Sequence, residues 1–151
     1  MRGNLLDRTY SEAMIRRVQQ LHAESTPCWG TMTAAEMLRH CNLVHAQMLA
    51  PAVQTQKKTT LRHYLLRWIV LYLLPRYPKG AQTPKDFRTK GTVDATTFEN
   101  EKQAFVDLLR RFALHLEPIA HWHPYFGQLS TLQWGRSSWK HVDHHLRQFG
   151  V

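Results

Sequence analysis

The sequence predicts an all-α protein, a four-helix up-and-down type bundle with an additional helix and long irregular connections. Five segments carry apolar residues at helical spacing, and none shows the alternation of apolar and polar residues that is typical of a half-buried strand. Three of these segments also open with a capping-box pattern, T-x-x-E or S-x-x-Q. With 151 residues, the chain is long enough for one core and too short for two ordinary domains. We therefore expect a single domain over residues 1–151.

The first two predicted helices are separated by a clear break. Residues 11–24 form the first helix, and the segment STPCWG then ends it with a proline and a glycine. Apolar residues recur along this helix at intervals of three and four: Met14, Ile15, Val18 and Leu21. The second helix begins at the capping box of Thr33 and Glu36 and ends before Pro51.

The third predicted helix, residues 60–74, is the most apolar part of the chain, and Pro75 ends it. Its stretch YLLRWIVLYLL is 11 residues long and contains Arg67. A helix that crosses a bilayer needs about 20 apolar residues. We therefore expect this segment to be a buried helix or a helix at an interface.

A long irregular segment precedes the fourth predicted helix. Residues 75–93 contain three prolines and two glycines in 19 residues and show no periodicity. The fourth helix is expected to open at the capping box of Thr96 and Glu99 and to end before Pro118.

The fifth predicted helix follows a second irregular piece, HWHPYFGQ. Ser130 and Gln133 form its capping box, and it extends to about Phe149. The irregular piece offers three residues that are expected to line a pocket next to the helices: His123, Tyr125 and, just after it, Trp134.

The charge and the cysteines bear on partners and location. The formal net charge of +9 would attract a polyanion such as nucleic acid or an anionic membrane surface. No run of five like charges is present, which favours a basic but otherwise ordinary surface. Cys28 and Cys41 lack the spacing of a disulfide framework or a zinc motif, and the N-terminus lacks a secretory pattern. We expect reduced thiols and a cytoplasmic protein.

Histidines near the C-terminus suggest a metal site. His141 and His145 are four residues apart on the last predicted helix, so both imidazoles lie on one edge of it, whereas His144 falls on the opposite, solvated side. One helix cannot surround an ion, so a third ligand must come from another helix. The second predicted helix offers His40 and His45, and periodicity alone does not choose between them.

The stretches MTAAEMLRHCNLVH and KHVDHHLRQF resemble the DinB/YfiT-like superfamily, whose bundle holds a divalent metal on three histidines. The resemblance implies that His40, His141 and His145 are the ligands, with His45 and His144 as weaker alternatives. The stretches LLPRYPKGAQTP and HPYFGQLSTLQWG are similar to a bacterial branch described only as a domain of unknown function. The resemblance also implies a homodimer, which the broadly apolar residues 68–73 support.

Three imidazoles leave one position of a tetrahedral ion open, which is typical of catalytic rather than structural zinc. Zinc or nickel would suit this donor set. The resemblance implies a hydrolase or a low-molecular-weight thiol S-transferase that acts on an unknown small molecule. Two other functions stay open: a non-catalytic metal-binding or stress-related binding module, and a basic binder of nucleic acid or membrane surfaces. Glu36 is explained by its capping box, and Asp143 points away from the histidine edge, so no general base is named.

Overall fold

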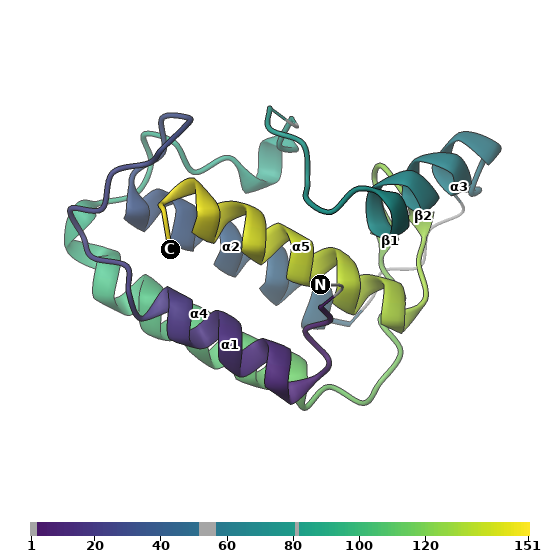
Figure 1. Cartoon of the computed structure of the whole chain (residues 1–151), viewed down its shortest axis with the longest axis horizontal. Helices are drawn as coiled ribbons and strands as arrows, with labels where there is room; N and C mark the ends of the chain where they lie inside the picture. The colour runs from purple at the N-terminus through teal and green to yellow at the C-terminus, as the bar shows by residue number, and fades with distance from the viewer. Residues whose placement is uncertain (1–2, 52–56, 81) are drawn as a thin grey trace.

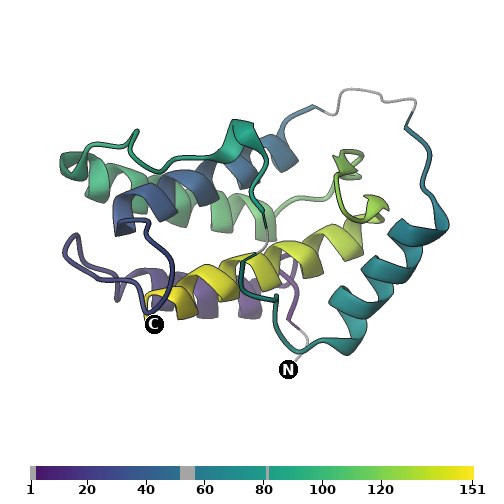
Figure 2. The ribbon, with the colours of Figure 1, turned by 90° about the horizontal axis from the view of Figure 1, so that it is seen from above.

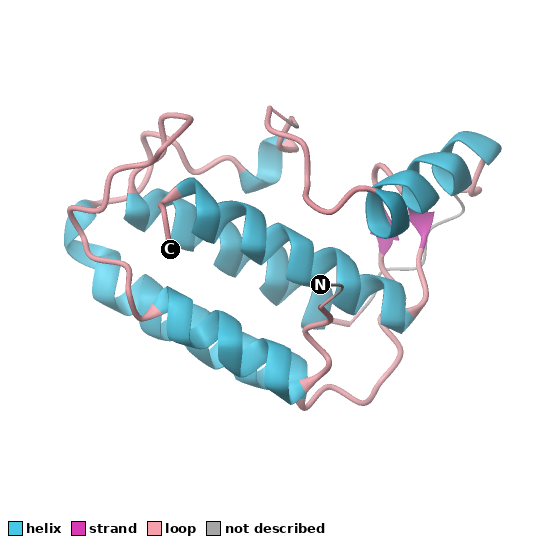
Figure 3. Cartoon of the chain, in the orientation of Figure 1, coloured by secondary structure: helices cyan, strands magenta, loops and turns pink. Residues whose placement is uncertain are grey.

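The computed structural model describes residues 3–51, 57–80 and 82–151. Within these residues the chain is mostly helical, with five α-helices and one small two-stranded antiparallel sheet (Figure 3). The α-helices are α1 (Arg8–Val18), α2 (Ala34–Leu49), α3 (Leu61–Trp68), α4 (Phe98–Ala113) and α5 (Thr131–Gln148). The strands are β1 (Trp122–His123) and β2 (Gly127–Gln128). A π-helix, η1 (Ile69–Leu73), continues α3, and two 3₁₀ turns, η2 (Lys85–Phe87) and η3 (Ala95–Thr97), precede α4.

Four of the α-helices form the body of the molecule. Helix α4 packs against α1 and α2, and α5 packs against the same two helices (Figures 1 and 2). Helix α3 and the small sheet lie together at one end of this body (Figure 1). The apolar stripes of the sequence meet in the core, where Phe105, Phe112, Leu38 and Leu146 are almost completely buried. This packing places the histidines of α2 and α5 on adjacent helices.

Two of the three predicted capping boxes are present, and both open helices that carry candidate ligands. The Thr33 hydroxyl accepts the Glu36 N–H at the start of α2, and the Glu36 carboxylate accepts the Thr33 N–H at 2.8 Å. The same arrangement of Ser130 and Gln133 opens α5. The buried Glu36 does more than cap, because its second oxygen accepts the backbone N–H of Gly91. Its carboxylate therefore ties α2 to the segment before α4.

We expect Glu36→Ala to lower the free energy of unfolding by about 1–3 kcal/mol, because it leaves two partly buried backbone N–H groups without their acceptor. Urea unfolding followed by circular dichroism measures the change. The control is Glu99→Ala, which removes an exposed carboxylate from the first turn of α4. An equal loss in both variants would contradict this role of Glu36.

The third predicted capping box is wrong. Helix α4 begins at Phe98 with Thr97 at the N-cap position, and the 3₁₀ turn η3 precedes it. The reason lies in Asp94, whose carboxylate accepts both the N–H and the hydroxyl of Thr96 at 2.8 Å. Thr96 is thereby held in the turn before the helix. Helix α4 also ends at Ala113, earlier than Pro118 suggested.

The first helix is displaced toward the N-terminus relative to the prediction. It begins at Arg8, where the Asp7 carboxylate caps the Thr9 N–H, and it ends at Val18. Leu21, the last residue of the predicted stripe, is still fully buried although it lies in the turn that follows. The apolar pattern therefore identified core positions correctly and overestimated the length of the helix.

The segment predicted as the third helix splits into α3 and the π-helix η1. Only Val70 and Leu71 of this segment are buried, so a wholly buried helix is the wrong interpretation. Leu61, Leu65 and Trp68 are exposed to 83%, 58% and 55%, respectively, and they lie on one face of α3 because their spacing is four and three residues. None of the helices in the described ranges has the length and apolarity needed to cross a membrane.

We expect a homodimer in solution, since the exposed face of α3 is more apolar than a solvated helix requires. Multi-angle light scattering should give twice the chain mass of 17.7 kDa. Leu65→Glu places a charge at the centre of this face and should shift the dimer toward monomer. A parent protein that is monomeric at micromolar concentration would rule out the dimer.

The sheet was not predicted from the sequence. Strands β1 and β2 pair Trp122 with Gln128 and His123 with Gly127, and each strand is too short to show an alternating pattern. Nδ1 of His123 accepts the backbone N–H groups of Tyr125 and Phe126 and so holds the turn. Gly127 has a φ of +69°, a conformation that glycine adopts without strain.

Candidate metal centre

Three histidines from two helices converge beside the core. His40 comes from α2, and His141 and His145 come from successive turns of α5. The potential ligand nitrogens of the three side chains all lie within 4.8 Å of one another. Nε2 of His40 lies 3.1 Å from Nε2 of His141. The i and i+4 spacing on α5 thus places two imidazoles opposite the imidazole of α2.

Hydrogen bonds fix the tautomers of two of these histidines. His40 Nδ1–H donates to the carbonyl oxygen of Phe87 at 2.8 Å, and His145 Nδ1–H donates to Oε1 of Gln148 at 2.9 Å. Gln148 is itself oriented, because its Nε2 donates to the carbonyl oxygen of Trp29 at 2.9 Å. Since both Nδ1 atoms carry the proton, both Nε2 atoms keep a lone pair. Outer-shell hydrogen bonds of this kind orient metal-binding histidines.

The partner of His40 is held by the segment before α4. Phe87 ends the 3₁₀ turn η2, which packs against α2. Two bonds fasten the following residues to α2: the Thr89 hydroxyl donates to the carbonyl oxygen of Glu36 at 2.7 Å, and the Gly91 N–H donates to its carboxylate. Glu36 therefore helps to position the carbonyl oxygen that orients His40.

Burial keeps the three imidazoles neutral. It lowers the pKa of His145 to about 3 and the pKa of His141 well below 6.5, and in both cases the neighbouring histidines lower it further. Burial also lowers the pKa of His40 against the opposing effect of its bond to Phe87. Neutral imidazole is the form that binds a metal ion. The site is therefore in its metal-binding protonation state at pH 7.

The donor set fits a divalent ion. Two imidazole nitrogens on one tetrahedral ion, with bonds of about 2.0–2.1 Å, lie about 3.3 Å apart, close to the 3.1 Å between His40 and His141. Without a cation, either tautomer of His141 leaves one of its two ring nitrogens without a suitable hydrogen-bond partner. If His141 donates from Nε2 to His40, its buried Nδ1 keeps an unpaired lone pair, because no described residue bonds to that atom. If the proton is instead on Nδ1, the Nε2 lone pairs of His40 and His141 face each other at 3.1 Å, and a cation between the two atoms would remove this repulsion.

The alternative ligand His45 lies close by but outside the group of three. It is fully buried, its Nδ1–H donates to the carbonyl oxygen of Cys41 at 2.7 Å, and its ring packs against Phe105 and Phe112. Its ring centroid is 5.4 Å from that of His141, and burial lowers the pKa of His45 to about 4. It is therefore a neutral residue that packs beside His141 in the core.

His144, the other alternative ligand, is also outside the group of three, but it is not on a solvated side of α5 as predicted. It is half-buried, lines the pocket described below and contacts the ring of Trp29, with centroids 5.8 Å apart. Lys79 in turn lies 4.1 Å from the Trp29 ring. Residues from other parts of the chain thus cover this side of α5, which a helical wheel of α5 alone does not show.

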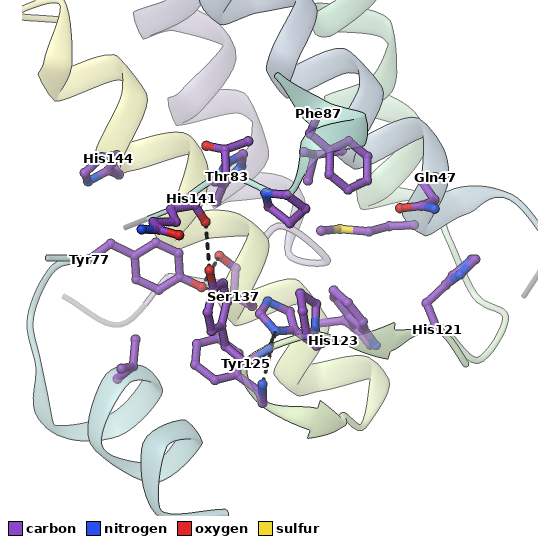
Figure 4. Close-up of a pocket in the computed structure, with 18 of the residues that line it drawn as sticks. Gln47, Tyr77, Thr83, Phe87, His121, His123, Tyr125, Ser137, His141 and His144 are labelled. Atoms are coloured by element: carbon purple, nitrogen blue, oxygen red, sulfur yellow. Dashed lines mark hydrogen bonds between the residues drawn. The ribbon is translucent and has the colours of Figure 1, made fainter. Parts of the chain in front are cut away.

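A pocket of about 580 Å³ opens onto the three histidines (Figure 4). Helices α2, α3 and α5, the segment from Tyr77 to Phe87 and the β1–β2 turn form its walls. The predicted lining residues His123, Tyr125 and Trp134 all lie in these walls. The Tyr125 hydroxyl donates to the carbonyl oxygen of Gln82 at 2.8 Å. Pockets of this size bind small molecules.

Sequence analysis missed two polar groups in this site. Tyr77 lines the pocket, and its hydroxyl lies 2.7 Å from the Ser137 hydroxyl (Figure 4). Burial raises the pKa of the Tyr77 hydroxyl. Gln148, which orients His145, was also missed, although its position three residues after His145 on the same helix was a usable signal.

Charged side chains are absent from the described wall. None of the residues that line the pocket in residues 3–51, 57–80 and 82–151 is Asp, Glu, Lys or Arg. As predicted, Asp143 does not face the histidines; it pairs with Arg17 and with Arg147, each at 2.9 Å. The site therefore combines a cluster of neutral histidines with an uncharged, mainly apolar pocket.

We expect Gln148→Met to weaken the affinity for zinc by about 10–100-fold, because methionine keeps the volume but cannot accept the His145 proton. Competition with a chromophoric chelator measures the affinity. Gln133→Met, which changes a glutamine in the first turn of the same helix, is the control. Equal affinities for all three proteins would show that Gln148 does not support the site.

Comparison with known proteins gives a family and no function. No curated protein and no solved structure matches the sequence. The family described as "Protein of unknown function (DUF1569)" matches residues 3–150, nearly the whole chain. The chain belongs to the DUF1569 family.

Proposed function

We propose that this protein is a metal-dependent enzyme that acts on a small molecule in the pocket above His40, His141 and His145. The observation that carries the proposal is the convergence of three neutral imidazoles, two buried and one half-buried, at the wall of a pocket large enough for a substrate. A divalent ion, zinc or nickel, would supply Lewis-acid activation of a thiol or a water molecule at its open position. Phe87 and Gln148 hold His40 and His145 in the required tautomer.

Thiol S-transfer is the reaction that the pocket supports best. Hydrolysis of an amide needs groups that take a proton from water and give one to the leaving amine. The described wall contains no carboxylate, and the hydroxyls of Tyr77 and Tyr125 are already bonded to Ser137 and Gln82. Burial lowers the pKa of the wall histidines His123 and His144, which makes them weaker bases. In S-transfer the sulfur of the deprotonated thiol forms the bond to carbon. The leaving group departs with the electron pair of the broken bond, and the thiol's proton is released. Hydrolysis stays the second candidate reaction.

The superfamily, the bundle arrangement and the cellular location of the protein are part of the same proposal. We place the chain in the DinB/YfiT-like superfamily as a four-helix bundle with an additional helix. The packing of α1, α2, α4 and α5, with ligands on α2 and α5, supports this placement. A cytoplasmic location is proposed as well, and the two free cysteines support it.

Metal-dependent turnover tests the proposal. Zinc- or nickel-loaded protein is incubated with a panel of thiols and alkyl electrophiles, and with aryl amides for the hydrolytic alternative. We expect turnover that is lost in His141→Ala and kept in His22→Ala, which removes an exposed histidine outside the site. Metal binding without turnover on any substrate would favour a non-catalytic metal-binding module. Steeply salt-dependent affinity for DNA or anionic vesicles would instead favour the polyanion binder.

A further inference from the structure

The neutrality of the pocket is unexpected in so basic a chain. The sequence carries 20 Lys and Arg residues and a net charge of +9, yet no described wall residue carries a formal charge. Six aromatic side chains dominate the wall: Tyr77, Phe87, Trp122, Tyr125, Phe126 and Trp134. The described wall thus offers no ion-pair partner to a substrate's carboxylate, phosphate or ammonium group.

Cations on or beside the elements that form the wall have partners of their own, among them Lys79, which lies over the Trp29 ring. Arg67 of α3 donates to the carbonyl oxygen of Gln128 at 2.7 Å and lies over the ring of Tyr64. Arg136 of α5 lies 4.6 Å from the centroid of the Tyr72 ring, and Lys140 donates to the carbonyl oxygen of Leu74. These side chains are engaged outside the pocket.

The polar groups of the wall are uncharged, and several of them are already hydrogen-bonded. The hydroxyls of Tyr77 and Tyr125 bond to Ser137 and Gln82, and Nδ1 of His123 accepts two backbone N–H groups. A charged group on a ligand would lose its hydration here without gaining a partner of opposite charge. An apolar or aromatic group would instead bury surface against aromatic rings.

We infer that the substrate of this pocket has a thiol head at the three histidines and an uncharged, apolar or aromatic body against the wall. The inference rests on the proposed function and adds the substrate class to it. Thiols whose bodies carry carboxylates or ammonium groups are excluded as preferred substrates. A neutral body of drug-like size fits the pocket volume of about 580 Å³.

Two thiols of matched shape test this inference on cobalt-loaded protein. The probes are 4-methylbenzyl mercaptan and 4-(mercaptomethyl)benzoate, which differ by a methyl group and a carboxylate on the same ring. Binding of sulfur to cobalt is followed by the sulfur-to-cobalt charge-transfer band. We expect the neutral thiol to bind at least about tenfold more tightly than the acid, since the acid's charge is desolvated without a partner.

Two substitutions test whether the pocket wall causes the preference for the neutral thiol. Leu66→Lys adds a cation to the wall of α3 and should reduce or reverse the preference for the neutral thiol. Leu132→Lys adds the same cation to an exposed position of α5, outside the pocket, and should leave the preference unchanged. An equal effect of both substitutions would point to general charge attraction and would overturn the role of the wall.

The outcomes separate the substrate class from the proposed function. If cobalt binds and the acid gives the same or higher affinity than the neutral thiol, the inference is overturned and the metal centre stands. If cobalt binds and neither thiol produces a sulfur band, thiol transfer and the inference are both overturned. If no cobalt binds, the proposed function fails, and the inference fails with it.

Discussion

His141→Ala is expected to weaken the affinity for zinc by more than about a hundredfold, the upper range for loss of an outer-shell partner, because it removes a ligand itself. The three rings are mutually close, with centroids 5.1 Å apart for His40 and His141, 4.7 Å for His141 and His145, and 4.9 Å for His40 and His145. The two remaining imidazoles would leave the ion with two protein ligands, whereas zinc sites in proteins have at least three. Chelator competition measures the loss.

His144→Ala is the matched control, because it removes the neighbouring histidine of the same helix, which lines the pocket but is not in the group of three. We expect its zinc affinity to equal that of the parent. Circular dichroism establishes that both variants remain folded. A large loss in His144→Ala with parent-like affinity in His141→Ala would move the metal site to the other edge of α5.

Acidification is expected to destabilise the metal-free protein as the pH falls below 6.5. Burial, reinforced by the neighbouring His63, lowers the pKa of His123 to about 3. The unfolded chain takes up a proton near pH 6.5 and the folded chain does not, so stability is lost as the pH falls from 6.5 toward 3. For one such histidine, the free energy of unfolding falls by at most about 1.4 kcal/mol per pH unit, which amounts to about 2.7 kcal/mol between pH 6.5 and pH 4.5. His45 and His145, whose pKa values are also lowered by burial, act in the same direction.

The His123→Asn variant isolates the contribution of His123 to the pH dependence of stability. The asparagine carbonyl oxygen replaces Nδ1 as acceptor of the Tyr125 and Phe126 N–H groups, and it does not titrate. Urea unfolding in the presence of a chelator, at several pH values between 4.5 and 7.5, should show a shallower pH dependence in this variant. An unchanged slope would mean that His123 is protonated equally in the folded and unfolded chain.

Local patterns in the sequence were sufficient to identify most of the helical framework. The capping boxes of Thr33 and Ser130 depend on residues three positions apart, so the sequence displays them directly. The spacing of His141 and His145 likewise requires only a helix, and the structure brings both together with His40. The resemblance was needed to select His40, because its orientation depends on Phe87, 47 residues further along the chain.

The remaining features depend on contacts that a single segment does not reveal. The burial of His144 depends on Trp29, more than a hundred residues earlier in the chain. The β1–β2 pair consists of two-residue strands, which carry no periodic signal. The failure of the Thr96 capping box depends on competition from Asp94 for the same N–H. In each case a second part of the chain or a competing side chain decides the structure.

The metal content of the untagged parent protein tests the central claim most directly. Plasma mass spectrometry after reconstitution with zinc or nickel and removal of excess metal should give close to one ion per chain. The same measurement on His145→Ala should give close to none. A parent protein that retains no ion after reconstitution with either metal would contradict the account, and His40, His141 and His145 would then be a buried histidine cluster without a metal.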